Sequence, residues 1–444
     1  MRTNLNLMKA TLTGALGGLL FGFDTIVISG AIDAIVRLYD LGPQGKGLTV
    51  AVGLVGTVVG ALGAGMVGQK LGGRETLRIT AVLYVISAVG CALAWNWPAF
   101  MLFRFIGGLG IGASSVLGPV YIAELAPAKI RGRLVATFQF NVVFGIMVAY
   151  TSNYLIRLMH LGAMEWRCQV GVAVFPAIAF LVLLFGIPRS PRWLAARDRN
   201  DEALAVLRLM GESKPEIELA EIREAMIQEH ATAHEPVFRW KYRYPLFLAI
   251  SIGAFNQLAG INAILYYLNN IFAAAGFNQV SSDQQAIAIG ATNFLFTLVG
   301  MSLIDKVGRK TLLLIGAAGT ACCLAAVSWL FATNSHPGAL VWVLITYIAF
   351  FSVSQGAVIW VYIGEVFPNH VRSKGQGVGS ASHWFMNAVI AFWFPVVVHS
   401  MSTATPFTFF AIMTLIQFLV VLFVYPETKG QTLEALQRRM MKVE

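Results

Sequence analysis

The sequence predicts an all-α membrane protein, with twelve transmembrane helices in two pseudo-symmetric six-helix bundles. The supporting observations are its composition, the spacing of its apolar segments and an internal repeat. Of its 444 residues, 57% are hydrophobic and only 12% are charged, whereas a soluble domain is about 45–50% apolar and about 25% charged. So few charges do not cover a water-facing surface, which excludes a large soluble enzyme and a disordered chain.

Twelve segments are long and apolar enough to cross a bilayer, whose hydrocarbon core requires about 20 apolar residues per helix. They cover residues 10–36, 48–68, 77–97, 99–122, 134–156, 168–187, 245–272, 285–305, 311–332, 339–364, 376–398 and 405–425. The first begins too close to the N-terminus, and carries Asp24 too deep, for a cleaved signal peptide. We therefore expect all twelve to be membrane helices.

The basic residues indicate how the helices are oriented. With both termini in the cytoplasm, 27 of the 32 Lys and Arg residues fall on the cytoplasmic side, and only Arg37, Lys46, Arg157 and Arg167 fall on the other. Cytoplasmic loops of membrane proteins carry such an excess. The net charge of +10 is thus explained by membrane topology and gives no support to nucleic-acid binding.

Short motifs occur twice, nearly the same distance apart, which indicates a duplicated six-helix unit. Residues 124–131 (ELAPAKIR) return as 365–372 (EVFPNHVR), 69–74 (QKLGGR) as 305–310 (DKVGRK), and 188–192 (PRSPR) as 426–430 (PETKG). The predicted organisation is a bundle over 1–187, a cytoplasmic linker with short amphipathic helices over 188–243, a second bundle over 244–430 and a cytoplasmic tail over 431–444. A regulatory docking role for the linker stays open.

Taken together, the motifs resemble those of the sugar porter family of the major facilitator superfamily. The resemblance runs from Gly17 to Gly430 and rests on the duplicated motifs together with 104–108 (RFIGG), 119–127 (PVYIAELAP) and 257–267 (QLAGINAILYY). Within this family the chain is similar to bacterial proton–sugar symporters and to animal glucose facilitators. It implies two bundles related by an axis along the membrane normal, with the substrate site between them.

Two charged residues lie deep within predicted spans and away from their ends, where an ionisable group is costly and usually functional. Asp24 lies in the first span and Arg104 in the fourth. They resemble the aspartate–arginine pair that couples proton movement to sugar movement in the symporters, whereas facilitators of the family carry an amide at the aspartate position. A static salt bridge that only fixes the helices is the alternative.

The resemblance also implies which residues bind the sugar. Amides and aromatic rings suit a sugar, because its hydroxyls donate and accept while its C–H faces are apolar. The predicted substrate-binding residues are Gln139, Gln257, Asn262, Asn293, Trp360, His383, Trp384 and Asn387, with Tyr266 and Tyr267 as a gate. Each one alone is equally compatible with helix packing.

Charged residues at the ends of the predicted spans form a predicted cytoplasmic latch. Carboxylates and guanidiniums at helix ends can pair between neighbouring helices and hold that side shut. The latch residues are Arg74, Glu124, Arg131, Asp305, Arg309, Glu365 and Arg372. A reading in which these charges only fix topology stays open.

The chain departs from the family's motifs at a few positions. Gly73 and Arg189 replace an arginine and a glutamate near the latch, and Asn256 and His383 replace amides near the sugar. Residues 356–357 read Gly-Ala instead of Gly-Pro, which affects how that helix bends.

The expected function is secondary active transport of a hexose or pentose by alternating access in the cell membrane, with protons as the coupling ion. An uncoupled facilitator and a membrane sugar sensor are the alternatives. The sequence contains no nucleophile–base set, metal-ligand cluster or phosphate loop, so we expect neither an enzyme nor a bound cofactor or metal. Its partners would be the monosaccharide, protons and the lipid bilayer, and we expect a monomer.

Overall fold

The computed structural model of the protein describes residues 4–127, 130–232, 236–368 and 371–430. These residues form helices and connecting turns, with no strand among them. The α-helices are α1 (Leu5–Leu38), α2 (Pro43–Leu71), α3 (Gly73–Leu93), α4 (Trp97–Leu125), α5 (Arg131–Leu158), α6 (Glu165–Gly171), α7 (Val174–Leu183), α8 (Pro191–Ala195), α9 (Asn200–Leu209), α10 (Pro215–Thr232), α11 (Arg243–Leu258), α12 (Ile261–Tyr266), α13 (Leu268–Ala274), α14 (Gln279–Val307), α15 (Arg309–Thr333), α16 (Pro337–Phe351), α17 (Ala357–Glu365), α18 (Arg372–Ser400) and α19 (Ala404–Phe423). Short 3-10 turns are η1 (Gly162–Met164), η2 (Leu184–Gly186) and η3 (Trp240–Tyr242), and η4 (Ser352–Gly356) is a π-helix.

The prediction of an all-α membrane protein is confirmed. Within the described residues, 12 helical segments are long and apolar enough to cross a membrane. Three of these segments are interrupted: the sixth between α6 and α7, the seventh between α11 and α12, and the tenth at η4. The break in the seventh segment lies between the predicted site residues Gln257 and Asn262, and the break in the tenth lies one turn before Trp360.

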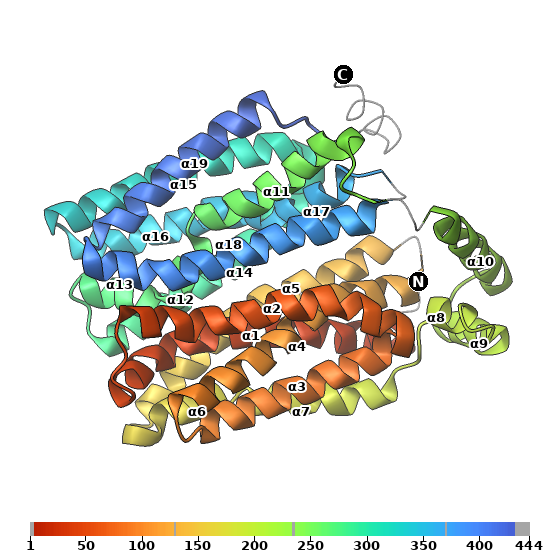
Figure 1. Ribbon diagram of the computed structural model, residues 1–444, viewed down its shortest axis with the longest axis horizontal. Coiled ribbons are helices and arrows are strands. Elements are labelled where there is room, and N and C mark those ends of the chain that lie inside the picture. Colours follow the sequence, from red (N-terminus) through yellow and green to blue (C-terminus); the bar gives the residue numbers. More distant parts are fainter. Residues whose placement is uncertain (1–3, 128–129, 233–235, 369–370, 431–444) are drawn as a thin grey trace. The chain divides into compact units, whose positions relative to one another are not determined.

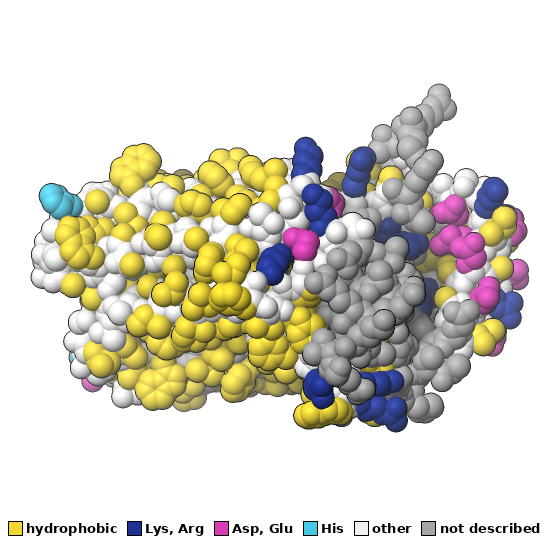
Figure 2. Space-filling view, turned by 90° about the horizontal axis from the view of Figure 1, so that it is seen from above, with side chains coloured by type: hydrophobic (Ala, Val, Ile, Leu, Met, Phe, Trp, Pro, Cys, Tyr) yellow, Lys and Arg dark blue, Asp and Glu magenta, His cyan; other side chains and the backbone are white. Residues whose placement is uncertain are grey.

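The exposed surface of these helices is apolar, as a lipid environment requires. Large hydrophobic side chains such as Phe175, Trp342 and Phe423 keep more than two thirds of their surface exposed (70%, 71% and 79%). On the face seen in Figure 2, hydrophobic side chains cover a large part of the described surface. Isolated monomers in water rarely expose so much apolar area.

The described residues divide by packing into two compact units (Figure 1). The first takes residues from 1–27, 55–152 and 161–234, and the second takes residues from 28–54, 153–160 and 235–444. Helices α1, α2 and α5 are therefore each shared between the units. This division follows contacts and not the repeat, so the predicted bundle boundaries stay a prediction, and the predicted tail, 431–444, lies outside the described residues.

The linker forms the short helices that its apolar pattern predicts. Helices α8, α9 and α10 belong to the first unit and pack on one another beyond the ends of its long helices (Figure 1). Their shared core contains Leu194 and Ala203, against which Val206, Leu219 and Ile222 pack. The predicted amphipathic helices are thus small, packed elements.

The internal repeat predicted from motifs reappears in local geometry. In the first unit the Tyr121 hydroxyl donates to the Pro188 carbonyl over 2.6 Å, and in the second the Tyr362 hydroxyl donates to the Pro426 carbonyl over 3.1 Å. Gly72 and Gly308 precede α3 and α15 with nearly the same backbone angles, φ 89° and 104°, which only glycine adopts readily. Each unit therefore builds one helix end in the same way.

Candidate functional site

The predicted pair of charged residues inside the spans is brought together. Arg104 Nη1 lies 3.1 Å from Asp24 Oδ2 and also donates to the Asp24 carbonyl over 3.3 Å. Their side chains are only 5% and 8% exposed. Loss of one partner of a buried ion pair leaves the other charge uncompensated, so each of these two residues depends on the other.

A helix break positions two of the predicted amides. Gly260 has a left-handed backbone, φ 82°, between α11 and α12, and a Cβ there would lie 2.3 Å from the Phe410 ring. Helix α11 therefore ends at Leu258, and Gln257 and Asn262 lie on either side of the turn. Their side chains meet because the chain changes direction between them.

Gln257 is the centre of a buried polar cluster. Its side-chain oxygen Oε1 accepts from Asn262 Nδ2 over 3.1 Å, and its Nε2 donates to Asn256 Oδ1 over 3.0 Å. The same Nε2 lies 3.3 Å from His383 Nε2. Gln257 is 1% exposed, so its amide is oriented from both ends by uncharged groups.

Aromatic rings flank this cluster. The His383 ring lies between Trp360 and Trp384, with ring centroids 5.0 Å apart on each side. Trp384 is 3% exposed, whereas Trp360 keeps 36% of its surface exposed. The structure therefore brings Gln257, His383 and the two indoles together from helices α11, α17 and α18.

The predicted gate residues have different partners. The Tyr266 hydroxyl accepts from Asn387 Nδ2 over 3.0 Å, whereas the Tyr267 hydroxyl donates to the Ala391 carbonyl over 2.8 Å. The Tyr267 ring stacks on Phe394. Asn387 Oδ1 is buried and has no hydrogen-bond partner among the described residues, which makes it an acceptor suited to a hydroxyl.

Two predicted substrate-binding residues lie elsewhere. Asn293 in α14 accepts from the Ser352 hydroxyl over 2.8 Å, which ties it to the π-helix η4. This π-helix ends at Gly356, so the tenth span is reshaped there without the proline that the family's Gly-Pro supplies. Gln139 lies half-buried in α5, within the first unit.

Three of the four predicted latch residues of the second half form a compact network. Arg309 binds the two oxygens of Glu365 with Nε and Nη2 over 3.2 and 2.8 Å, and its Nη1 lies 2.9 Å from Asp305 Oδ1. Thr428 donates to Glu365 over 2.6 Å. A bidentate guanidinium–carboxylate pair of this kind fixes orientation as well as charge.

The sequence analysis missed Glu427, which completes this network. Its carboxylate accepts from the backbone N–H groups of Arg309 and Lys310 over 2.9 and 3.0 Å, where α15 begins. These are N–H groups that a helix leaves without an internal partner. Although partial burial opposes ionisation, four backbone N–H donors hold the pKa of Glu427 below its usual value of 4.5.

We expect Glu427→Gln to destabilise the protein by about 1 kcal/mol, as loss of a helix N-terminal cap does. A carboxylate with a lowered folded-state pKa stabilises the fold above its unfolded pKa, and that contribution disappears as the pH falls through the folded pKa. Thermal unfolding of the detergent-purified protein checks this: the difference between wild type and variant should be full at pH 7 and shrink below about pH 4.5. A difference that is the same at pH 3 and pH 7 would contradict it.

The corresponding network in the first half has its charges reversed. Arg189 stands at the repeat position of Glu427 and lies 3.5 Å from Glu75, which also binds Arg74 over 2.6 Å and Arg78 over 2.8 Å. Here a glutamate holds the arginines together, whereas in the second half an arginine holds the carboxylates. Glu75 was also missed by the sequence analysis, because no repeated motif contains it.

The remaining latch residues lie at helix ends, as predicted. Arg131 begins α5 and lies 3.5 Å from Glu218 of α10, so the linker helices are tied to the end of a long helix. Glu124 lies in the last turn of α4, and Arg372 begins α18.

The chain matches the sequence model of the family described as "Sugar (and other) transporter" over residues 10–440. It is 36% identical to the arabinose-proton symporter of Bacillus subtilis, over 96% of this chain and 93% of that protein. It is 33% identical to the D-xylose-proton symporter of Escherichia coli, over 98% and 97%. It is also 34% identical to the glucose transport protein of a Synechocystis strain, over 95% and 94%.

Solved structures show the same fold. The inward-open conformation of the xylose transporter XylE from E. coli has a TM-score of 0.87 at 32% identity, over 98% of this chain and 99% of that chain. XylE bound to 6-bromo-6-deoxy-D-glucose has a TM-score of 0.81 at 32% identity, over 99% and 100%.

Proposed function

The chain belongs to the sugar transporter family, and on that premise we propose that it carries a monosaccharide across the cell membrane together with a proton. The observation that carries this proposal is the uncharged cluster around Gln257, flanked by the His383 ring and two indoles. Amides that both donate and accept, next to aromatic faces, match a neutral polyhydroxylated ring. A pentose or hexose is therefore the proposed substrate class.

Sugar contacts are proposed for Gln139, Gln257, Asn262, Asn293, Trp360, His383, Trp384 and Asn387. The buried acceptor Asn387 Oδ1 supports its role, since a sugar hydroxyl can donate to it. Tyr266 is proposed to gate the site, because its hydroxyl bond to Asn387 couples its position to a binding residue. Tyr267 is proposed as the second gate residue.

Proton coupling is assigned to Asp24 and Arg104. A carboxylate that is paired in one state and protonated in the other binds a proton on one side of the membrane and releases it on the other. Their contact and their burial support this role. No cofactor other than the proton is proposed.

We place both termini in the cytoplasm, because 27 of the 32 basic residues then face inward. The charge networks around Arg309 and Glu75 then lie on the cytoplasmic side, where they act as latches that break when that side opens. The transporter is proposed to work by alternating access as a monomer.

The experiment that tests this function uses purified protein in detergent and in proteoliposomes. We expect arabinose, xylose or glucose to raise the unfolding temperature, and the stabilising sugar to accumulate in vesicles only when the outer solution is more acidic. If no sugar on this panel stabilises the protein, the substrate class is wrong. If uptake equilibrates but never exceeds the outer concentration under a pH gradient, the protein is a facilitator.

A further inference from the structure

Two carboxylates occur near the ends of helices in the second unit, away from the proposed coupling pair. Asp33 of α1 accepts from Lys46 of α2 over 2.9 Å and from the amide of Asn270 of α13 over 2.8 and 2.7 Å. The side chains of Lys46 and Asp33 are 18% and 36% exposed.

Asp283 of α14 is the second carboxylate. It accepts from Asn269 Nδ2 of α13 over 2.7 Å. It also accepts from Arg157 Nε of α5. Arg157 also donates to Gln279 over 3.4 Å. The Asp283 side chain is 2% exposed and that of Arg157 is 12% exposed, so this ion pair is largely withdrawn from water.

Consecutive amides of α13 therefore bind one carboxylate each. We call the six side chains Asp33, Lys46, Asn270, Arg157, Asp283 and Asn269 the outer clamp. They come from both halves of the sequence, because α1, α2 and α5 belong to the first six spans and α13 and α14 to the last six. All six nevertheless lie in one compact unit, so the clamp holds the ends of α1 and α5 against α13 and α14, while Lys46 ties α2 to α1.

We propose that Asp33 and Asp283 are positioning residues of the transport cycle, which set how readily the outer side of the transporter opens. This inference rests on the proposed transport function and orientation, which place Lys46 and Arg157 on the outer face. During alternating access the first-half helix ends must leave α13 and α14. Opening then breaks the bonds from Asn270 to Asp33 and the pair of Arg157 with Asp283.

The clamp is built so that neither carboxylate is left alone when it opens. Asp33 keeps Lys46, since both lie in first-half helices, and Asp283 keeps Asn269, since both lie in second-half helices. An uncompensated buried charge is strongly destabilising. The retained partners lower that penalty, so the clamp is a reversible latch and not a permanent bridge.

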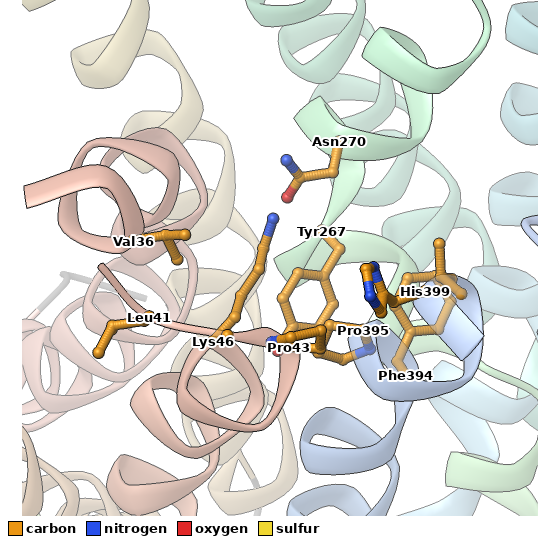
Figure 3. A pocket seen from close by; sticks show the side chains of 11 residues that line it. Val36, Leu41, Pro43, Lys46, Tyr267, Asn270, Phe394, Pro395 and His399 are labelled. Atoms are coloured by element: carbon orange, nitrogen blue, oxygen red, sulfur yellow. The ribbon is translucent and has the colours of Figure 1, made fainter. Parts of the chain in front are cut away.

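The two sides of the clamp differ in their access to solvent. A cavity of about 650 Å³ is lined by Lys46, Asn270 and Tyr267 together with His399 and apolar side chains. Figure 3 shows the ends of Lys46 and Asn270 pointing toward one another beside this cavity. Asp33 is thus open to solvent, with 36% of its side chain exposed and its partners Lys46 and Asn270 on the cavity wall, whereas Asp283 is shielded, and screening by water weakens an ion pair. The Arg157–Asp283 pair should therefore dominate.

The first test is the kinetics of Arg157→Gln and Asp283→Asn for sugar supplied from outside. Apparent affinity follows the fraction of molecules in the binding-competent state, so weakening the clamp should lower KM about three- to tenfold. It should also lower the maximal rate, because the outer side closes more slowly. Arg157→Lys keeps the positive charge and should return KM to within about twofold of wild type.

A purely structural role predicts less folded protein and a lower maximal rate at unchanged KM, and that result would overturn the proposal. The matched control is Arg167→Gln, which removes another arginine of the proposed outer face, one that donates to the Ala92 and Ala94 carbonyls. Its KM should equal that of wild type. If Arg167→Gln shifts KM as Arg157→Gln does, the effect comes from surface charge in general, and the proposal is wrong.

The second test does not depend on sugar transport. In a variant without the four native cysteines, Val36→Cys places a thiol on the cavity wall. A membrane-impermeant maleimide added outside should label it about three- to tenfold faster when Arg157→Gln is also present. Equal rates would overturn the clamp. If wild type carries no sugar but the labelling rate still responds, the transport function fails while the clamp stands.

Discussion

Asp24→Asn protein should fail to accumulate sugar against a gradient while still exchanging sugar across the membrane. A gradient of one pH unit is worth about 1.4 kcal/mol per proton, which supports about tenfold accumulation. The asparagine is neutral in every state, so it binds no proton and releases none. The accumulation ratio should therefore fall to about 1, the value for an uncoupled carrier.

The physical basis of this prediction is the burial of the pair. Arg104 Nη1 lies 3.1 Å from Asp24, and both side chains are at most 8% exposed. In such surroundings the charge state of one partner controls the other. Asparagine permanently imposes the state that protonation creates in wild type, so binding and exchange persist and only the coupling is lost.

Uptake of labelled sugar into proteoliposomes, with and without a pH gradient, measures accumulation, and counterflow measures exchange. Asp33→Asn is the matched control, because it removes another carboxylate from α1 that is not assigned to proton movement. It should change kinetics but not the final accumulation ratio. Continued accumulation by Asp24→Asn would show that the proton is carried elsewhere.

Gln257→Ala should weaken sugar binding about 30- to 100-fold, the worth of roughly two hydrogen bonds to buried neutral groups. Gln257 orients Asn262 and Asn256 and lies beside His383. Truncation removes the amide and also leaves those groups without the partner that holds them. Titration calorimetry, or the sugar dependence of thermal unfolding, gives the change in affinity.

Gln417→Ala is the matched control for this substitution. Gln417 of α19 is also 1% exposed and accepts from the amide of Gln355 over 3.0 Å, but it is not assigned to the sugar site. It should lower the unfolding temperature while affinity stays within about twofold of wild type. Equal losses of affinity in both variants would mean that Gln257 acts through stability alone.

The sequence predicts most of the fold because membrane helices require long apolar segments and because the duplicated half repeats its motifs. A transmembrane helix must satisfy its backbone internally and present apolar side chains, so long apolar segments predict helices with little ambiguity. The Asp24–Arg104 contact was predictable for a related reason. Charges are so rare within spans that two of opposite sign are natural partners.

The contacts that were not predicted join residues that are close in space, and their positions along the sequence do not indicate this. Asp283 was overlooked because it lies just outside the predicted span 285–305, whereas α14 begins at Gln279 and buries it. Asp33 lies within its predicted span, but its pairing with Asn270 joins positions 237 apart in the chain. The role of Glu427 depends on where α15 begins relative to the end of α19, which is a property of packing.

The reversed charges of the two halves mean that the same substitution has opposite electrostatic effects in the two networks. Arg189 faces Glu75, whereas at the matching repeat position Glu427 faces the start of α15 at Arg309. Mutation of Arg189 to glutamate would place a second carboxylate beside Glu75, and the two would then share Arg74 and Arg78. The effect of changing residue 189 therefore depends on the charge at residue 75, so the two positions are not independent.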